Sequence, residues 1–447
     1  MNDRATSTTG ADAVGAVRVG PAPDAGPAAP AALAQAAGPG TVGPPLSSGA
    51  TVDGRERRGR PAPGTGTSPS TPADVSPTRI EGLLLGIAAG DAAGWPAARH
   101  RAARMPEWTR RLTRELDTFA EQNATTTLPV PIALNQPPEP LRLGPSDDAE
   151  WAAHTALAVI AGAAAAADGG GTADQAVRSA VARSWQALAA RIAAASQAAP
   201  EVESAVIPLR ARISVRAGLG NLATGLRPPA TGHDNPHYFD DAACVRSCVL
   251  AAVHPGDPAA AARLAEFDAR YTQDGDGVHG ARAMAAAVAE ALAGADVDTA
   301  VAAALGMLPE DTEIGRNARH AVRLAQAADD VFGLVPLLEH RIVDHVYSYG
   351  IAAAETVPVA LALAVAARGD LARAVPAAAC LSRVADSAPA LAGALTGALG
   401  STLPQSWRDA CRTLCGCALP RLAGTDLCGI AAELAEELAE LGARTAN

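Results

Sequence analysis

Lysine is absent from this chain of 447 residues, so each of its 36 basic side chains is an arginine. Aromatic residues are almost as scarce, at 3% of the chain, whereas 49% of the residues are hydrophobic and alanine dominates among them. The cores of β-sandwiches are built from β-branched and aromatic side chains, so this composition argues against that fold class. Small side chains favour closely packed helices instead. We attribute the missing lysines to genomic base composition, and the remaining composition predicts an all-α protein.

A surplus of positive charge is also lacking. The net charge is −11, and residues 1–77 are neutral, with six arginines against five aspartates and one glutamate. The whole negative charge therefore falls on the rest of the chain. An acidic domain without a basic stripe repels a polyphosphate backbone, so we expect no nucleic-acid partner.

Long apolar runs are missing as well. The N-terminus has no apolar run of the kind that a secretory signal needs, and the best apolar stretch, Thr356–Ala367, is too short to span a membrane. The seven cysteines are odd in number and spread thinly, which does not suit a disulfide framework. We therefore expect a soluble, cytoplasmic protein with no membrane partner.

Residues 1–77 consist mostly of Ala, Pro, Gly, Ser and Thr and hold almost no large apolar side chain. A segment of this kind buries too little surface to offset its conformational entropy, so a disordered tail is predicted. Thr78 and Glu81 then form the pattern of a capping box ahead of an apolar run. A compact multi-helix domain is expected over residues 78–447.

Apolar residues recur at helical spacing through most of this domain, and no stretch supports a strand. Helices are predicted at about 150–167, 173–197, 242–253, 257–270, 278–294, 297–306, 315–330, 337–363, 370–381, 388–399, 404–416 and 427–442. Two long irregular segments interrupt them, at about 118–145 and 217–241. Unstructured connections of that length in a compact domain are usually functional or disordered, and we expect these two to border a site.

Three short motifs contain the residues that could carry chemistry, and the first is the run from Gly86 to Pro96 (GIAAGDAAGWP). We expect the first helix to end in its small residues just before Asp91, with Gly94 close behind. Glycines let the backbone approach either a ligand or a neighbouring helix. Tight helix packing is therefore the alternative to a binding site here.

The second motif, Ser146-Asp147-Asp148, opens the helix that begins near Trp151. A hydroxyl and two adjacent carboxylates offer three hard oxygens, a ligand set that suits Mg²⁺ or Mn²⁺. Serine and aspartate are also favoured as helix caps, so capping without a metal is the alternative.

The third motif, Asp386-Ser387, again places a carboxylate and a hydroxyl at the start of a small-residue helix, with Pro389 in its first turn. The second and third motifs could face each other across a cleft and hold one cation jointly.

Together, and in this order, the three motifs resemble the ADP-ribosylglycohydrolase family, whose pattern is GDA-x-G-x-P, then (S/T)DD-x, then a late D(S/T) before a Gly/Ala-rich helix. Ala353–Val359 resembles the penultimate helix of the family, and Asp268–Gln273 its central one. Asp241–Arg246 lies where the family has a Gly/Asn loop and an arginine. The resemblance covers about residues 79–409.

This resemblance implies an all-α domain with a binuclear Mg²⁺ or Mn²⁺ site at the bottom of a cleft. Such a domain hydrolyses the glycosidic bond at the anomeric carbon of ADP-ribose attached to proteins, or a related bond. The metal ligands implied are Ser146, Asp147, Asp148, Asp386 and Ser387. The substrate-binding residues implied are Asp91, Gly94, Asp241 and Arg246. The partner would be an ADP-ribosyl or other ribosyl small molecule, or a modified protein.

The chain departs from the family pattern at three points. In the late motif Val384 replaces an acidic residue and Arg383 a glycine; Ala98 lies where an acidic residue is common, and Gln273 where a histidine is frequent. One lost carboxylate weakens a site for two dications, since hard cations need the charge. We therefore expect one tightly bound Mg²⁺ or Mn²⁺ ion.

Two hypotheses for the function follow. The first is a metal-dependent hydrolase. The second is an impaired pseudoenzyme that binds an ADP-ribose-like ligand or serves a structural or interaction role.

Overall fold

The computed structural model describes residues 76–99, 144–167, 172–198, 211–344 and 350–445. Within these ranges it contains sixteen α-helices and no strand, which confirms the all-α prediction. The helices are α1 (Pro77–Arg99), α3 (Asp147–Ala167), α4 (Ala173–Ala198), α6 (Ile213–Ala223), α7 (Ala230–His233), α8 (Ala242–Leu250), α9 (Pro258–Ala269), α10 (Gly275–Leu292), α11 (Val297–Met307), α12 (Glu313–Gln326), α13 (Val331–Arg341), α14 (Ala353–Ala366), α15 (Leu371–Cys380), α16 (Ala388–Ala398), α17 (Gln405–Cys411) and α18 (Leu427–Thr445). The predicted tail falls outside the described residues except for its last two, and so does the predicted irregular segment 118–145 except for its last two.

Two predictions about element boundaries are wrong. The stretch 337–363 was expected to form one helix, but it contains the end of α13 and the start of α14. Gly350 lies between them with a φ of 74°, a left-handed conformation that glycine adopts without strain. The stretch 217–241 was expected to be irregular, yet it contains most of α6 and all of α7.

Helix α1 also differs from its prediction at both ends. It begins at Pro77, where the carbonyl of Ser76 accepts hydrogen bonds from the backbone N–H groups of Arg79 and Ile80. The predicted cap, Thr78, therefore lies inside the helix. The helix then continues to Arg99 and includes Asp91, rather than ending before it. Alanine is the strongest helix former, and the alanines between the glycines offset part of their helix-breaking effect.

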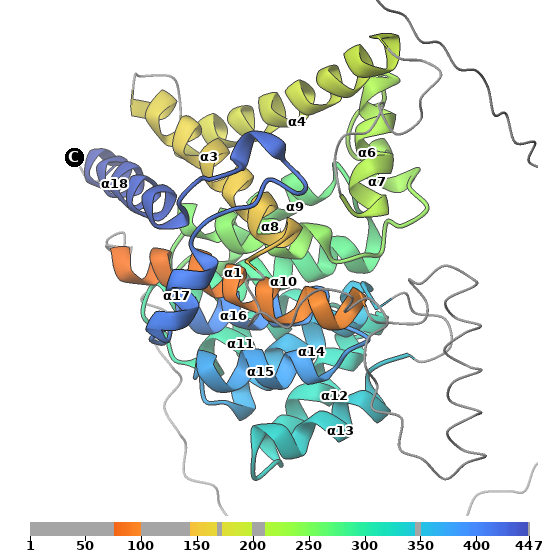
Figure 1. The fold of residues 1–447 in the computed structure, drawn as a ribbon, viewed down its shortest axis with the longest axis vertical. Coiled ribbons are helices and arrows are strands. Elements are labelled where there is room, and N and C mark those ends of the chain that lie inside the picture. The colour runs from red at the N-terminus through yellow and green to blue at the C-terminus, as the bar shows by residue number, and fades with distance from the viewer. Residues whose placement is uncertain (1–75, 100–143, 168–171, 199–210, 345–349, 446–447) are drawn as a thin grey trace, which may run out of the picture. The chain divides into compact units, whose positions relative to one another are not determined.

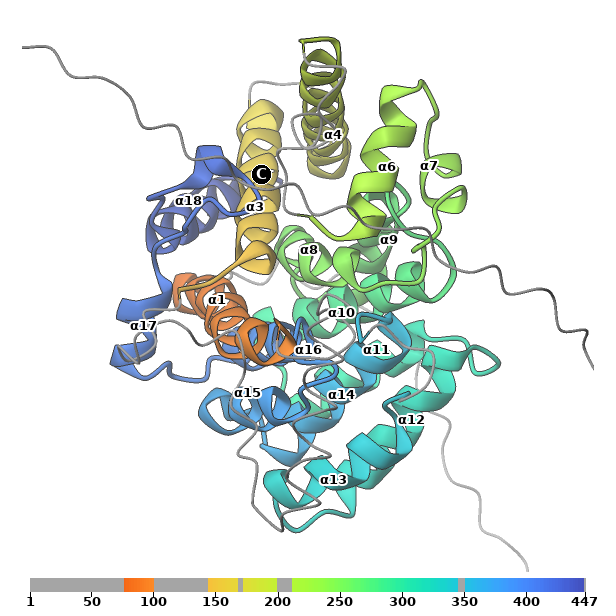
Figure 2. The ribbon, with the colours of Figure 1, turned by 45° about the vertical axis from the view of Figure 1, so that its right-hand side comes forward.

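The glycines of α1 form a close contact with α16, and the two helices lie side by side in both views (Figures 1 and 2). A Cβ atom on Gly86 would lie 2.1 Å from the carbonyl oxygen of Gly393, and one on Gly393 would lie 2.0 Å from that of Gly86. The contact is antiparallel and repeats every fourth residue, so that Gly82 faces Gly397, Gly90 faces Pro389 and Gly94 faces Ala385. Any side chain at these glycines would separate the helices. The tight-packing alternative for the first motif is therefore confirmed.

The contact also positions the candidate site. Asp91 directly follows one of the contact glycines, and Asp386 and Ser387 stand between two α16-side contact positions, Ala385 and Pro389. The spacing of α1 and α16 therefore sets the separation of their polar residues.

Two further helices complete the surroundings of this pair. α10 is buried along most of its length and packs against α8, α9, α11 and α14. α3 packs against α4, α8 and α18. By length and composition α3 could cross a membrane, but 72% of its apolar window is buried inside the protein. Because a core helix passes the same test, this is weak evidence for a span.

We predict that Gly86→Ala destabilises the domain by about 1–3 kcal/mol or more, since the added methyl meets backbone that cannot move without separating the helices. Gly306→Ala is the matched control, because Gly306 lies in α11 with no atom near the added carbon. That change should stabilise by about 0.5–1 kcal/mol through helix propensity. Urea unfolding followed by circular dichroism measures both, and equal effects would contradict the close contact.

Candidate functional site

The acidic residues of the candidate site lie where helices begin. Asp147 and Asp148 belong to the first turn of α3, and Asp241 is the N-cap residue of α8. Asp386 precedes Ser387, the N-cap residue of α16. The positive end of a helix dipole stabilises negative charge at each of these positions.

An arginine that the sequence analysis did not single out joins these residues. Arg212 is the N-cap residue of α6 and is only 8% exposed. Its Nη1 atom donates to Asp386 Oδ2 at 3.0 Å and lies 3.3 Å from Asp241 Oδ1. Its Nη2 atom donates to Asp148 Oδ1 at 3.0 Å and to the hydroxyl of Ser387. One guanidinium thus connects the starts of α3, α8 and α16.

The backbone that carries Arg212 is held by a buried network of amides. The Nδ2 atom of Asn235 donates to the carbonyl of Ser214 at 2.8 Å. The Nε2 atom of Gln273 donates to Ser214 Oγ at 2.9 Å and to Asp240 Oδ1 at 2.8 Å. Gln273, which replaces a frequent histidine of the family pattern, therefore ties the start of α6 to the residue next to Asp241.

Asp91 reaches from α1 to the start of α3. Its Oδ2 atom accepts hydrogen bonds from the backbone N–H groups of Ser146 at 2.7 Å and Ala149 at 3.1 Å. Its Oδ1 atom accepts from the Ser146 hydroxyl at 2.7 Å. Asp91 thus caps α3 from another helix. The same hydroxyl lies 3.1 Å from Asp147 Oδ1, so its single proton has two acceptors within reach. The lone pairs of the Ser146 oxygen are left for a further partner.

Burial acts on the charges of all these carboxyl groups. Burial, reinforced by the charge of Asp147, raises the pKa of Asp91 from 3.8 to about 7. Burial likewise raises the pKa of Asp241 to about 6, although the positive charge of Arg212 lowers it in part. The pKa values of Asp147 and Asp148 are raised by burial too, again against the opposing effect of Arg212. Burial therefore favours the protonated form of these carboxyl groups, and the single guanidinium of Arg212 offsets this effect only in part.

Two residues assigned to substrate binding have packing roles in the fold. Gly94 lies against the backbone of Ala385, just before α16. Arg246 is 1% exposed, and its donors bond to Asp268 Oδ2 at 2.8 Å, Thr272 Oγ1 at 2.9 Å and a backbone carbonyl. Its guanidinium also lies 4.9 Å from the ring centre of Trp185. Contact of either residue with a substrate stays a prediction.

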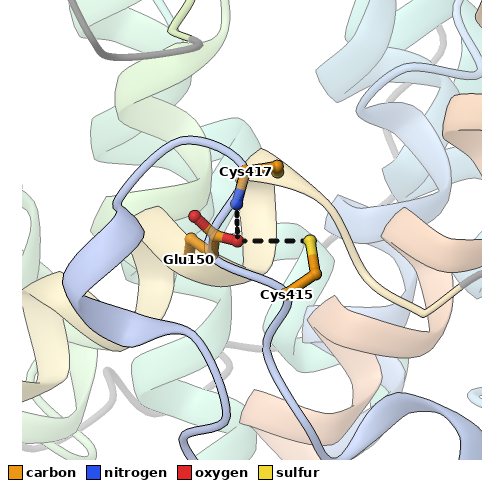
Figure 3. A group of neighbouring side chains, drawn as sticks. All are labelled: Glu150, Cys415 and Cys417. Carbon is orange, nitrogen blue, oxygen red and sulfur yellow. Dashed lines mark hydrogen bonds between the residues drawn. The ribbon is translucent and has the colours of Figure 1, made fainter. Parts of the chain in front are cut away.

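A second group of side chains that could bind a metal includes Glu150, from the first turn of α3, which faces Cys415 and Cys417 (Figure 3). The ligand atoms of the three lie within 4.8 Å of one another. The carboxylate of Glu150 accepts hydrogen bonds from the backbone N–H groups of Cys417, Ala418 and Leu419 at 2.7, 2.8 and 2.7 Å. These hydrogen bonds satisfy the Glu150 carboxylate without an ion. Through them Glu150 holds the segment after α17 against α3.

A family model of ADP-ribosylglycohydrolases matches residues 72–444. The chain belongs to the ADP-ribosylglycohydrolase family. One solved structure, described as an ADP-ribosylglycohydrolase-related protein complex, is similar at 20% identity and a TM-score of 0.43, over 82% of this chain and 98% of that one. No curated protein matches the chain closely enough to be called a relative. Membership in the ADP-ribosylglycohydrolase family supports a glycohydrolase-like function.

The divalent metal that this family implies can be tested against the residues present. Carboxylates and hydroxyls are the ligands that Mg²⁺ and Mn²⁺ prefer. Among the described residues, Asp148 Oδ2 is buried without a hydrogen-bond partner, as an oxygen that awaits a cation would be. Arg212, however, already occupies Asp148 Oδ1, Asp386 and Ser387. The donor set of this ADP-ribosylglycohydrolase-family chain therefore fits a hard cation, with part of it committed to the guanidinium.

Sequence reasoning found the acidic residues but missed their cation. Asp148 lies some 240 residues before Asp386 and Ser387 in the chain, yet all three bond to a single guanidinium. In the sequence Arg212 is one arginine among many, and no motif marks it as the partner of the acidic residues. Val384 is fully buried in the apolar core, so whether it occupies the place of the family's first acidic residue stays a prediction.

The raised pKa of Asp91 predicts how stability depends on pH. The native state keeps a proton on Asp91 up to about pH 7, whereas the unfolded chain releases it near 3.8. Stability is therefore lost as the pH rises through 7, by roughly 1.4 kcal/mol between pH 6 and 8 for this one group in the presence of chelator. Asp91→Asn should remove that loss. Urea unfolding at pH 6, 7 and 8 measures it, and an unchanged slope in the variant would contradict the shift.

The bonds of Glu150 lead to a second prediction. Glu150→Gln should destabilise the domain by about 1–3 kcal/mol, because an amide cannot accept all three backbone bonds. Cys415→Ser, at an exposed cysteine, should change stability by less than about 0.5 kcal/mol. Thermal unfolding and metal analysis of both variants decide the matter. If each variant loses one bound ion that the wild type retains, the group is a metal site instead.

Proposed function

We propose that this protein is a hydrolase that depends on a divalent metal and cleaves a glycosidic bond at the anomeric carbon of an ADP-ribosyl or related ribosyl substrate. The observation that carries the proposal is the convergence of Asp148, Asp241 and Asp386, from three helix starts, on one guanidinium. Family membership supports the reaction class.

The residues divide into three groups by what they could do. Ser146, Asp147 and Asp148 present oxygens at the start of α3, where Mg²⁺ or Mn²⁺ would bind. A bound dication supplies positive charge that orients the ribose hydroxyls and lowers the pKa of a water molecule. Asp91 orients Ser146 through the hydroxyl bond and fixes the first turn of α3. Asp241 and Asp386 face the same centre from α8 and α16.

A second candidate function is a binding protein that holds an ADP-ribose-like ligand without cleaving it. Two observations favour it. Arg212 occupies oxygens that the family pattern assigns to metal, and Val384 provides no carboxylate beside Asp386. An ADP-ribose-like small molecule or a modified protein remains the proposed ligand in either case. We also propose a cytoplasmic location and no nucleic-acid or membrane partner.

The proposed role of Asp148 as a metal ligand is tested by comparing it with a second acidic residue at a helix start. Asp148→Ala should abolish the stabilisation of the protein by added Mg²⁺ or Mn²⁺, because binding to the native state alone raises stability. Asp257→Ala is the matched control, since Asp257 caps α9 by accepting from the N–H of Ala260 at 2.9 Å. That variant should lose about 0.5–2 kcal/mol with or without metal. If Asp148→Ala behaves like Asp257→Ala, Asp148 is only a capping residue.

Hydrolysis is assayed on the same variants. Release of ADP-ribose from proteins modified at arginine or serine, with Mg²⁺ present, should be measurable for the wild type and fall at least about 100-fold in Asp148→Ala. Metal-dependent stabilisation without any release from either substrate would favour the binding protein over the hydrolase.

A further inference from the structure

The carboxylate cluster encloses the positively charged guanidinium of Arg212. The side chain of Arg212 is 5% exposed, and those of Asp148, Asp241 and Asp386 are 4%, 0% and 12% exposed. A guanidinium stays protonated throughout the pH range in which proteins are folded. A buried charge of this kind is tolerated only when it is paired. Arg212 is therefore a fixed component of the cluster rather than a surface side chain that happens to lie near it.

The guanidinium leaves part of the cluster without a partner. Its Nη1 atom contacts Asp386 and Asp241, and its Nη2 atom bonds to Ser387 and to the Oδ1 atom of Asp148. The Oδ2 atoms of Asp148 and Asp241 are both buried and have no hydrogen-bond partner in the described part of the chain. Polar atoms left in this state point to a missing ligand beside the guanidinium.

We propose that Arg212 takes the place of one of the two divalent ions that the family resemblance implies, so that the residues present fit one ion and not two. The oxygens left for that one ion are those of Ser146, Asp147 and Asp148 Oδ2. The proposal rests on the proposed function only in treating the cluster as a cation site, and it requires no turnover. Mg²⁺ and Mn²⁺ share the required chemistry, since both prefer oxygen ligands.

The oxygens that Arg212 occupies limit the number of ions. Its donors bond to Asp148 Oδ1, Asp386 Oδ2 and the hydroxyl of Ser387. A dication bound to the same oxygens would lie next to the guanidinium and be repelled by its positive charge. Four carboxylates, from Asp147, Asp148, Asp241 and Asp386, act on Arg212. When all four are ionised their charge exceeds that of the guanidinium, which favours a dication at the oxygens that remain. The arginine therefore excludes one of two ions through the oxygens that it occupies, whatever residue stands at position 384.

The test counts bound ions in the full-length protein. Wild type, Arg212→Met and Arg212→Lys are titrated with Mn²⁺ by calorimetry, and bound manganese is measured after desalting. We expect about one ion for the wild type and for Arg212→Lys, which keeps the charge, and two for Arg212→Met. Two ions or none in the wild type would overturn the proposal, and so would a count in Arg212→Met equal to that of the wild type.

A matched control separates this effect from the general cost of removing a buried arginine. Arg246 is 1% exposed and bonds to Asp268, so Arg246→Met also leaves a buried carboxylate without its partner. Both variants should melt at a lower temperature than the wild type in chelator. Millimolar Mn²⁺ should restore most of the lost melting temperature in Arg212→Met and little of it in Arg246→Met. Equal recovery in the two variants would overturn the proposal.

If Arg212→Met fails to fold, the wild-type ion count still tests the proposal, because two bound ions would overturn it. This count is also independent of hydrolysis. A wild type that binds one ion but releases no ADP-ribose would sink the proposed reaction and leave the role of Arg212 standing. A wild type that binds two ions and releases ADP-ribose would support the proposed reaction and overturn the role of Arg212.

Discussion

The mutual repulsion of buried carboxylates is the constraint on which this site depends. Asp148 and Asp241 are almost completely enclosed, and Asp386 and Asp147 lie beside them. A carboxylate out of water is stable only with hydrogen-bond donors, a helix dipole or a cation close by. The helix starts supply the dipoles, and Arg212 supplies one positive charge. The negative charge that remains when these carboxylates are ionised is the physical reason why we propose a further cation in the cluster.

The scaffold brings these charges together through the smallest side chains. α1 and α16 approach so closely that backbone oxygen lies where a Cβ atom of Gly86 or Gly393 would be. Asp91 caps α3 from that position, which links the α1–α16 pair to the metal-ligand candidates. An alanine-rich sequence with few aromatic residues suits this design, because bulky side chains would hold the helices apart.

Much of the fold could be predicted from the sequence, because helical periodicity and capping residues are local signals. The helix class, most helix boundaries and the oxygen-rich helix starts at Ser146 and Asp386 all follow from such signals. The length of α1 did not follow, because its glycines suggested an ending while tertiary packing against α16 continued the helix through Asp91. The same tertiary information was needed for Arg212, whose partners lie 64 and 174 residues away.

The Glu150 group shows the opposite difficulty, since its three ligand-type side chains meet in space without a standard metal spacing in the sequence. The bonds to the backbone N–H groups of Cys417, Ala418 and Leu419 explain the meeting without an ion. Proximity of ligand types is therefore weaker support for a metal than an oxygen left without a partner, and Asp148 and Asp241 offer such oxygens among the described residues of the cluster.

The most direct test of this account is the anomalous diffraction of a crystal of the wild-type protein soaked in Mn²⁺, which locates each bound ion and the side chain of Arg212 together. The account predicts one anomalous peak, adjacent to Asp147 and Asp148, with the guanidinium still bonded to Asp386 and Ser387. Two peaks with Arg212 displaced from the cluster would contradict it.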